Sequence, residues 1–318
     1  YAMEGLVSGP GLKIFAQTWN AGGDVSQWYV DGVPTLMGNI DLTEVEEWVS
    51  IGTAEHPWTG VFNGNGKKII NLKSSKPLFG VCENATIKNV VFDETSTISV
   101  IGSYEGALYL APLAAEIKSS VIENCTNNAQ VSLDASCATT SNTVYVGGLV
   151  AKADATSVVK RSSNFGTINI PSSCTTAAGS TFNVGALVGH NAGIIEDGFN
   201  NGPIELGAQV HIAYVGGIVG YNELGATVRN NQNAAAITYS TKRSGSSSYG
   251  YVGGISGIGN GTISGNTNEG DITSKSNVHT LYVGGITTYV GDSNAQLTDN
   301  SQANASDLEL EGGNLNAY

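Results

Sequence analysis

The chain of 318 residues carries a formal net charge of −13, and 13% of its residues are charged, against about 25% in an average soluble protein. It has 42 glycines and 7 prolines, a turn-rich composition that favours β-structure over a solenoid of helices. The negative charge argues against nucleic acid and anionic lipid as partners.

The first predicted element is a short helix over residues 11–21. Its apolar residues recur at the spacing of one helical face: Leu12, Phe15, Ala16 and Trp19. Pro10 suits the start of a helix and Gly22 its end. We expect this helix to close one end of the coils that follow, as part of a cap over residues 1–30, because an open solenoid end exposes apolar side chains and unpaired strands.

Residues 31–99 contain short strand-like runs that predict the first, degenerate coils. These runs are residues 39–42, 61–62, 68–72, 78–80 and 86–92. The Asn-Gly steps at residues 63–66 have the chemistry of a tight turn.

From about residue 100 to residue 310 the chain repeats one segment, in which an aliphatic residue precedes two small residues and another aliphatic residue follows them. Its copies begin at Tyr109, Tyr145, Asn183, Tyr214, Tyr251 and Tyr282. The small residues of successive copies are about 31 to 38 positions apart, a period typical of solenoids and propellers.

Two neighbouring columns favour a right-handed parallel β-helix with three short strands in each coil. One column is aliphatic and is expected in the core: Ile122, Val159, Ile195, Val228, Ile263 and Leu297. The next is charged, with signs that alternate from coil to coil: Glu123, Lys160, Glu196 and Arg229. Stacked coils lie ~4.8 Å apart, so these charges would pair on the surface. The whole chain, residues 1–318, is predicted to form a single domain.

Two further columns predict how the coil turns. An amide recurs after the second strand: Asn127, Asn164, Asn200, Asn233, Asn268 and Gln302. Asparagine tolerates left-handed backbone and can bond to the amide above it, so we expect a ladder at a corner. The aliphatic residues on both sides of each glycine pair are both expected in the core, which requires a bend or bulge at the glycines.

The segments Val184-Gly185-Ala186-Leu187-Val188-Gly189-His190-Asn191 and Val215-Gly216-Gly217-Ile218-Val219-Gly220-Tyr221-Asn222 resemble the GLUG-motif repeats. The leader, with residues 39–42, 51–53 and 58–66, is similar to the same family. Such repeats occur in large surface and secreted bacterial proteins, notably of gut Bacteroidetes, and in some immunoglobulin A-cleaving metallopeptidases. The resemblance implies a β-helix of the pectate-lyase-like kind in a cell-surface or secreted setting, and it implies no activity. Copies near the two ends, at residues 111–112 and 286–288, depart from the motif.

The cysteines suggest one disulfide. Cys137 and Cys174 each follow an equivalent residue of the third strand, Val131 and Ile168, by the same spacing. A separation of one coil, ~5 Å, lies within the range that a disulfide can bridge. We therefore predict a Cys137–Cys174 bridge, which would suit an oxidising compartment; two free thiols are the alternative. Cys125 is expected to pack in the core, and Cys82 has no obvious partner.

The chain offers no clear catalytic or metal site, and we expect no cofactor. His56, His190, His211 and His279 lack zinc-binding spacing. Glu196 and Asp197 are flanked by basic residues, and no pair of carboxylates suited to glycoside hydrolysis is visible. Catalysis is therefore not expected, although a polysaccharide lyase or glycoside hydrolase of the β-helix type stays the alternative function.

The recurring tyrosines are the candidate ligand-binding face. They are Tyr109, Tyr145, Tyr214, Tyr251 and Tyr282, interrupted by Asn183. Aligned aromatic rings can stack on sugars or anchor a protein, but they can equally form a packing ladder that covers the glycines of the next coil. We expect a structural or adhesive module, monomeric within a longer surface protein, that binds a glycan or a host or bacterial surface protein.

The sequence also bears on where the protein resides. No apolar run approaches the ~18 residues of a membrane span, and no signal peptide is recognisable. We expect a cell-surface or secreted location, with the anchor or targeting signal outside this sequence.

Overall fold

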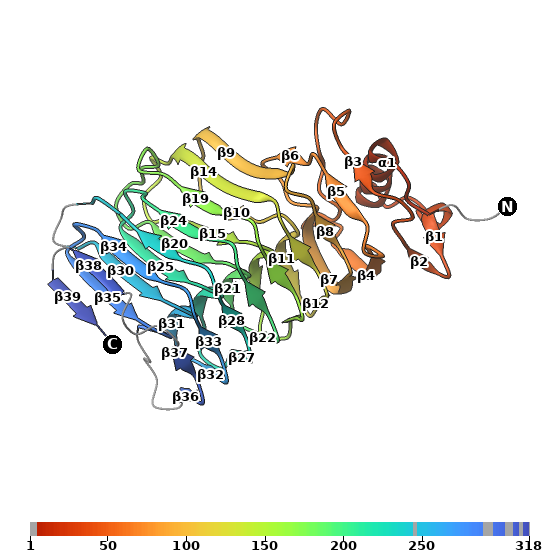
Figure 1. The fold of residues 1–318 in the computed structure, drawn as a ribbon. Helices are drawn as coiled ribbons and strands as arrows, with labels where there is room; N and C mark the ends of the chain where they lie inside the picture. The colour runs from red at the N-terminus through yellow and green to blue at the C-terminus, as the bar shows by residue number, and fades with distance from the viewer. Residues whose placement is uncertain (1–4, 244–246, 289–294, 303–307, 312–313, 318) are drawn as a thin grey trace.

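The computed structural model describes residues 5–243, 247–288, 295–302, 308–311 and 314–317. The first four residues of the predicted cap lie outside this description. The chain forms a parallel β-solenoid with one short helix at its N-terminal end (Figure 1). The coils follow one another in chain order, and the C-terminus lies at the opposite end from the helix. The predicted parallel β-helix with an N-terminal helix is therefore confirmed.

The helix α1 spans Gly9–Asn20, so it begins two positions before the predicted start. Ser8 caps it, because the Ser8 hydroxyl accepts a hydrogen bond from the Gly11 amide at 3.2 Å. Pro10 lies in its first turn, where a proline ring is tolerated. The helix buries Leu12, Phe15 and Ala16, as its periodicity predicts.

The buried face of α1 packs on aromatic residues at the start of the solenoid. The Phe15 ring lies 5.5 Å from that of Trp28, 5.6 Å from Trp58 and 6.2 Å from Phe62, centroid to centroid. Trp28 ends the short helix η1 (Ser26–Trp28), which leads into the antiparallel pair β1 (Tyr29–Val30) and β2 (Val33–Pro34). This aromatic cluster covers the N-terminal end of the core, as a cap must.

Each regular coil contains more strands than the predicted three. One coil consists of β15 (Thr143–Gly147), β16 (Val150–Ala153), β17 (Val158–Lys160), β18 (Ser163–Asn164) and β19 (Ile168–Ile170). The predicted Gly-Gly strand is thus two strands that meet at the glycines, and the predicted asparagine turn is itself a two-residue strand.

These strands stack into four parallel sheets, named here by their features. The tyrosine sheet has seven strands: β10 (Leu108–Leu110), β15, β20 (Thr181–Gly185), β25 (Ile212–Gly216), β30 (Tyr249–Gly253), β35 (Thr280–Gly284) and β39 (Asn314–Ala317). The asparagine sheet has nine: β3 (Ile40–Asp41), β5 (Lys68–Ile70), β8 (Val91–Phe92), β13 (Thr126–Asn127), β18, β23 (Phe199–Asn200), β28 (Gln232–Asn233), β33 (Thr267–Asn268) and β37 (Ser301–Gln302).

The other two sheets complete the coil. The long sheet has thirteen strands: β4 (Trp58–Asn63), β7 (Phe79–Lys88), β11 (Ala114–Lys118), β12 (Val121–Glu123), β16, β17, β21 (Val188–Asn191), β22 (Ile194–Glu196), β26 (Val219–Asn222), β27 (Thr227–Arg229), β31 (Ser256–Gly259), β32 (Thr262–Ser264) and β36 (Gln296–Thr298). The fourth sheet has eight: β6 (Lys73–Ser74), β9 (Thr97–Ser103), β14 (Gln130–Ser136), β19, β24 (Ile204–Leu206), β29 (Ile237–Tyr239), β34 (Ile272–Lys275) and β38 (Leu308–Glu311).

The predicted aliphatic column lies in register and in the core, with one exception. Ile122 pairs with Val159, Val159 with Ile195, and the register continues to Leu297. The members from Ile122 to Ile263 are almost completely buried, whereas Leu297 is 48% exposed. The prediction of a buried Leu297 is wrong, because this residue belongs to β36, the end strand on its side of the long sheet.

The neighbouring charged column pairs as its alternating signs predict. The Lys160 ammonium lies 3.8 Å from the Glu123 carboxylate, and the Arg229 guanidinium lies 2.5 Å from that of Glu196. Arg161 also pairs with Glu123. These groups are partly exposed, so each pair contributes roughly 0–1 kcal/mol and serves mainly to hold the register.

The asparagines form the predicted ladder. Each side-chain amide donates to the side-chain oxygen one coil further along, at 2.8, 3.0, 2.8, 2.7 and 2.7 Å from Asn127 to Gln302. The expectation of left-handed backbone at these asparagines is wrong. Positive φ recurs instead just after the second strand that a coil contributes to the long sheet, for example at Asn124 (57°) and Asn230 (56°), where the chain turns into the asparagine sheet.

The predicted bend at the glycines is confirmed. The strand β15 ends at Gly147 and β16 begins at Val150, so the chain passes from the tyrosine sheet to the long sheet at this point. Val146 and Leu149 on either side are both completely buried. At the same corner, Gly220 of β26 lies against the preceding coil so closely that an added Cβ would meet the Val184 amide nitrogen at 2.4 Å.

Candidate functional site

The five predicted tyrosines lie over one another on the outer face of the tyrosine sheet. Strand register pairs Tyr109 with Tyr145, then Tyr145 with Asn183, and Asn183 with Tyr214. It continues from Tyr214 to Tyr251 and Tyr282. All five tyrosine side chains are half-buried, because each lies against its neighbours along the stack.

The rings of this column cover one another. Tyr109 and Tyr145 stack at 4.9 Å with an interplanar angle of 21°, and Tyr251 and Tyr282 stack at 4.9 Å and 10°. Tyr214 and Tyr251 lie at 5.0 Å and 30°. Each of these rings therefore has at least one neighbouring ring in the column, and Tyr251 has two. The stack breaks at Asn183, where no ring of this column lies next to Tyr145 or Tyr214 on that side.

A second outward column, on the long sheet, meets the tyrosines across the corner. It consists of Glu116, Lys152, His190, Tyr221 and Ile258, paired in register along the sheet. The His190 ring contacts Tyr145 edge-on at 5.6 Å and stacks on Tyr221 at 5.0 Å and 10°. Tyr221 in turn meets Tyr214 edge-on at 5.1 Å.

These contacts join the two columns into one chain of rings, which we call the aromatic band. Its members are Tyr109, Tyr145, His190, Tyr221, Tyr214, Tyr251 and Tyr282, in order of contact. His190 and Tyr221 bridge the break at Asn183. The band therefore extends along the solenoid without interruption.

The sequence analysis missed the part of the band that lies on the long sheet. Lys152 follows Tyr145 at the same spacing as His190 follows Asn183 and Tyr221 follows Tyr214, so the sequence does contain the signal. Strict strand alternation does not predict these outward side chains. In the long sheet, the residue just before each of Lys152, His190 and Tyr221 has no partner in the strand pairing, so the alternation is interrupted there. This irregularity turns the side chains of Lys152, His190 and Tyr221 outward, next to the tyrosines.

Charged groups gather around the centre of the band. The Lys152 ammonium lies 5.6 Å from the Tyr145 ring centroid and 3.6 Å from the Glu116 carboxylate, a cation–π contact supplemented by an ion pair. His190 Nε2 lies 2.6 Å from Glu223 Oε1. Each positive or protonatable group here thus has an acidic neighbour.

Burial dominates the titration of the band. It lowers the pKa of His190 below its usual range, although the Glu223 carboxylate acts in the opposite direction. It raises the pKa of Tyr214 to about 12, with Tyr251 and Tyr221 adding to the shift. Near pH 7 the imidazole is therefore neutral and the phenol keeps its proton.

Two buried polar atoms at the break have no hydrogen-bond partner within the described residues: Asn183 Oδ1 and His190 Nδ1. Asn183 is only 3% exposed. When His190 is neutral and its Nε2–H is donated to Glu223, its Nδ1 is an acceptor. The break therefore contains two buried acceptors without a hydrogen-bond donor, and buried acceptors without a donor are uncommon in folded proteins.

The predicted disulfide is not formed. All four cysteines lie in the described part of the chain, and all four are free and buried. The assumed register is wrong, because Cys137 pairs with Thr176 and not with Cys174. The Cys137 thiol instead accepts a hydrogen bond from the Asn142 side-chain amide at 3.2 Å. Cys125 packs in the core as predicted.

We expect the native thiols to react slowly with an alkylating reagent at pH 8. Burial raises the pKa of Cys174 to about 11 and that of Cys125 to about 12, and only the thiolate reacts. Mass spectrometry after timed alkylation should show modification at least about tenfold slower than in urea. Rapid native labelling of Cys125, in the centre of a coil, would contradict this burial.

The acidic residues considered for catalysis are engaged in other contacts. Arg229 Nε binds Glu196 at 2.8 Å, in addition to the contact from its terminal nitrogen. Across the described ranges, no group of three or more histidine, cysteine, aspartate or glutamate side chains could hold a metal ion. No helix among these residues is long and apolar enough to cross a membrane.

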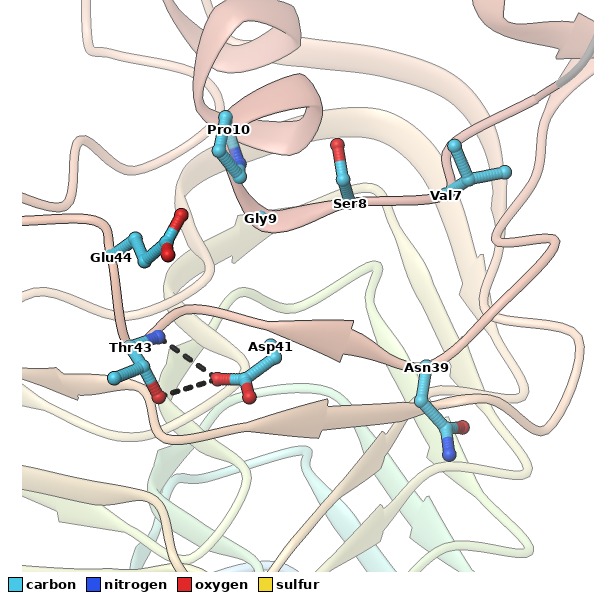
Figure 2. Close-up of a pocket in the computed structure, with 8 residues that line it drawn as sticks. All are labelled: Val7, Ser8, Gly9, Pro10, Asn39, Asp41, Thr43 and Glu44. Atoms are coloured by element: carbon cyan, nitrogen blue, oxygen red, sulfur yellow. Dashed lines mark hydrogen bonds between the residues drawn. The ribbon is translucent and has the colours of Figure 1, made fainter.

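A pocket of about 430 Å³ lies away from the band, beside the first turn of α1. Figure 2 shows Ser8, Gly9 and Pro10 on one side and Asp41, Thr43 and Glu44 on the other. The Asp41 carboxylate accepts hydrogen bonds from the amide and hydroxyl of Thr43, at 2.9 and 2.6 Å, and from the Asn71 side chain at 3.0 Å. These bonds lower the pKa of Asp41 and give it a structural role.

Comparison with known proteins supports the fold. No family model matches the chain, and no curated protein is similar to it. Among solved structures, it is similar to a "putative immunoglobulin A1 protease" from Bacteroides ovatus, with a TM-score of 0.57 and 16% identity over 98% of this chain and 83% of that one. It is also similar to a protein named IgA1 protease, with a TM-score of 0.52 and 20% identity over 93% of this chain.

The second neighbour is much longer, since the match covers only 21% of its length. With so few identical residues, both likenesses establish a shared β-solenoid fold alone. They neither place the band in a known site nor transfer an activity to this chain.

Proposed function

We propose that this chain is a surface-exposed or secreted β-helix module with a structural and adhesive role, which binds a glycan or a surface protein through the aromatic band. The band carries the proposal, because it groups seven rings with planar and charged polar groups on one outer surface. Aromatic side chains with a polar edge are the usual anchors of such surfaces.

An extracytoplasmic setting is part of the same proposal. It is supported by the resemblance to surface-protein repeats and by the likeness to a Bacteroides protein named as a protease of immunoglobulin A1. The module would act as a monomeric part of a larger surface protein, with no cofactor of its own.

A peptidase is the other function that the comparisons raise, because both solved neighbours carry that name. The match to the protein named IgA1 protease covers only 21% of that protein, so most of it has no counterpart in this chain. A polysaccharide lyase or glycoside hydrolase, the alternative from the sequence, gains no specific support, since Glu123 and Glu196 are held in ion pairs with arginine.

A glycan array tests the proposal. The protein should be retained on at least one glycan, and Tyr145→Ala and Tyr214→Ala should each weaken that retention about tenfold or more, because each removes an anchoring ring. Phe165→Ala is the control, since Phe165 is an aromatic residue 42% exposed outside the band. Equal loss in the control, or retention that survives both tyrosine variants, would contradict a role for the band. A blank array would leave a purely structural module.

A further inference from the structure

The break in the tyrosine stack differs in chemistry from the rest of the aromatic band. Elsewhere in the column, Tyr109 stacks on Tyr145, and Tyr251 lies between Tyr214 and Tyr282. At Asn183 the column instead presents an amide between Tyr145 and Tyr214. Tyr145 and Tyr214 therefore have no tyrosine ring between them, and His190 and Tyr221 contact them edge-on.

The polar groups of the band also lie at the Asn183 break. Asn183 Oδ1 and His190 Nδ1 are buried acceptors without a partner within the described residues. Glu223, which holds His190 at Nε2, is 45% exposed at its side chain. Lys152 lies over Tyr145 on the adjoining coil. A buried acceptor without a donor costs free energy, so a ligand that donates to it gains affinity there.

From this geometry we propose that the Asn183 break is the subsite of the band that binds a sugar unit, with a ligand hydroxyl donating to Asn183 and the sugar ring resting on an adjacent tyrosine. The inference rests on the proposed function. Planar amides, carboxylates and aromatic faces together are the groups that bind a neutral sugar, which has both an apolar face and hydroxyl donors.

Charge favours a neutral sugar over an acidic one. Lys152 already neutralises Glu116 at 3.6 Å, and His190 is held by Glu223 at 2.6 Å. The chain as a whole carries a net charge of −13. Among the described residues, the cations at the break are therefore already paired, and the protein as a whole would repel an added carboxylate.

Access requires a small movement. Because Asn183 is 3% exposed, the ligand hydroxyl reaches it when the His190 ring turns outward. The partner of that ring, Glu223, lies at the surface, so the ring can turn without breaking the core.

The test replaces Asn183 with the residue that stands in the other coils. Asn183→Tyr should fold, because the five other copies carry tyrosine at this position, and it should fill the break with a ring. Binding of a neutral array glycan should fall about tenfold or more, while the melting temperature stays the same or rises. Asn183→Leu, which keeps the size and removes the acceptor, should weaken binding and leave the fold as stable or more stable.

Phe165→Ala is the control, because Phe165 is an exposed aromatic residue that lies outside the band. It should bind as the unmodified protein does. Full binding by Asn183→Tyr and Asn183→Leu would overturn the subsite while leaving the proposed function intact, and so would a preference for uronate or sialylated glycans. Absence of binding by the unmodified protein would instead overturn the proposed function itself.

Discussion

Replacing Asn200 with alanine is expected to lower the free energy of unfolding by about 3–5 kcal/mol. The Asn200 side chain is completely buried in the middle of the asparagine ladder. It accepts hydrogen bonds from the Asn164 side chain at 3.0 Å and the Gly202 amide at 2.9 Å, and it donates to Asn233 at 2.8 Å. Alanine removes all three bonds, leaves the Gly202 amide without this acceptor and opens a gap between two coils.

Chemical denaturation followed by circular dichroism measures this loss. Asn201→Ala is the matched control, because Asn201 is the same residue type at the next position and is exposed. The control should change stability by less than about 0.5 kcal/mol. Equal stability of the two variants would show that the ladder contributes little and that apolar burial alone holds the coils together.

Replacing Gly220 with alanine is expected to cost about 3 kcal/mol or more. An added Cβ would lie 2.4 Å from the Val184 nitrogen, 2.7 Å from the Gly189 carbonyl oxygen and 2.9 Å from the Asn183 carbonyl carbon. All three atoms belong to the backbone of the preceding coil. No side chain can therefore move aside, and relief requires the two coils to separate at the corner.

The variant should show a lower midpoint of denaturation and weaker packing of the aromatic band. Gly38→Ala provides the control, since the nearest atom to a Cβ at Gly38 is the Val7 carbonyl oxygen at 3.8 Å, an ordinary contact. A Gly220→Ala protein as stable as this control would mean that the corner is looser than the structure indicates.

The regular parts of this fold are predictable from the sequence because stacking makes the same demand on every coil. The aliphatic column from Ile122 to Ile263 must be buried in each coil, and the ladder from Asn127 to Gln302 must bond from coil to coil, so both recur at fixed spacing. The opposite charges of Glu196 and Arg229 follow from the same register.

The unpredicted features depend on local departures from that regularity. The pairing of Cys137 with Thr176 depends on the lengths of two irregular loops, which no column constrains. The contact of His190 with Tyr145 depends on an irregularity in the long sheet that strict alternation does not reveal. The positive φ at Arg161 lies at a residue type that rarely adopts it, so residue type alone did not identify the corner.

The direction of the hydrogen bonds between coils has a mechanical consequence. These bonds run along the solenoid axis, since every sheet pairs a strand with its counterpart one coil away. A force that pulls the two ends apart therefore loads the bonds of one interface at a time, and the molecule yields by peeling off single coils. Each coil of about 31 to 38 residues would release roughly 100–130 Å of chain. A protein built in this way absorbs tension in steps, and the coils that remain keep their shape.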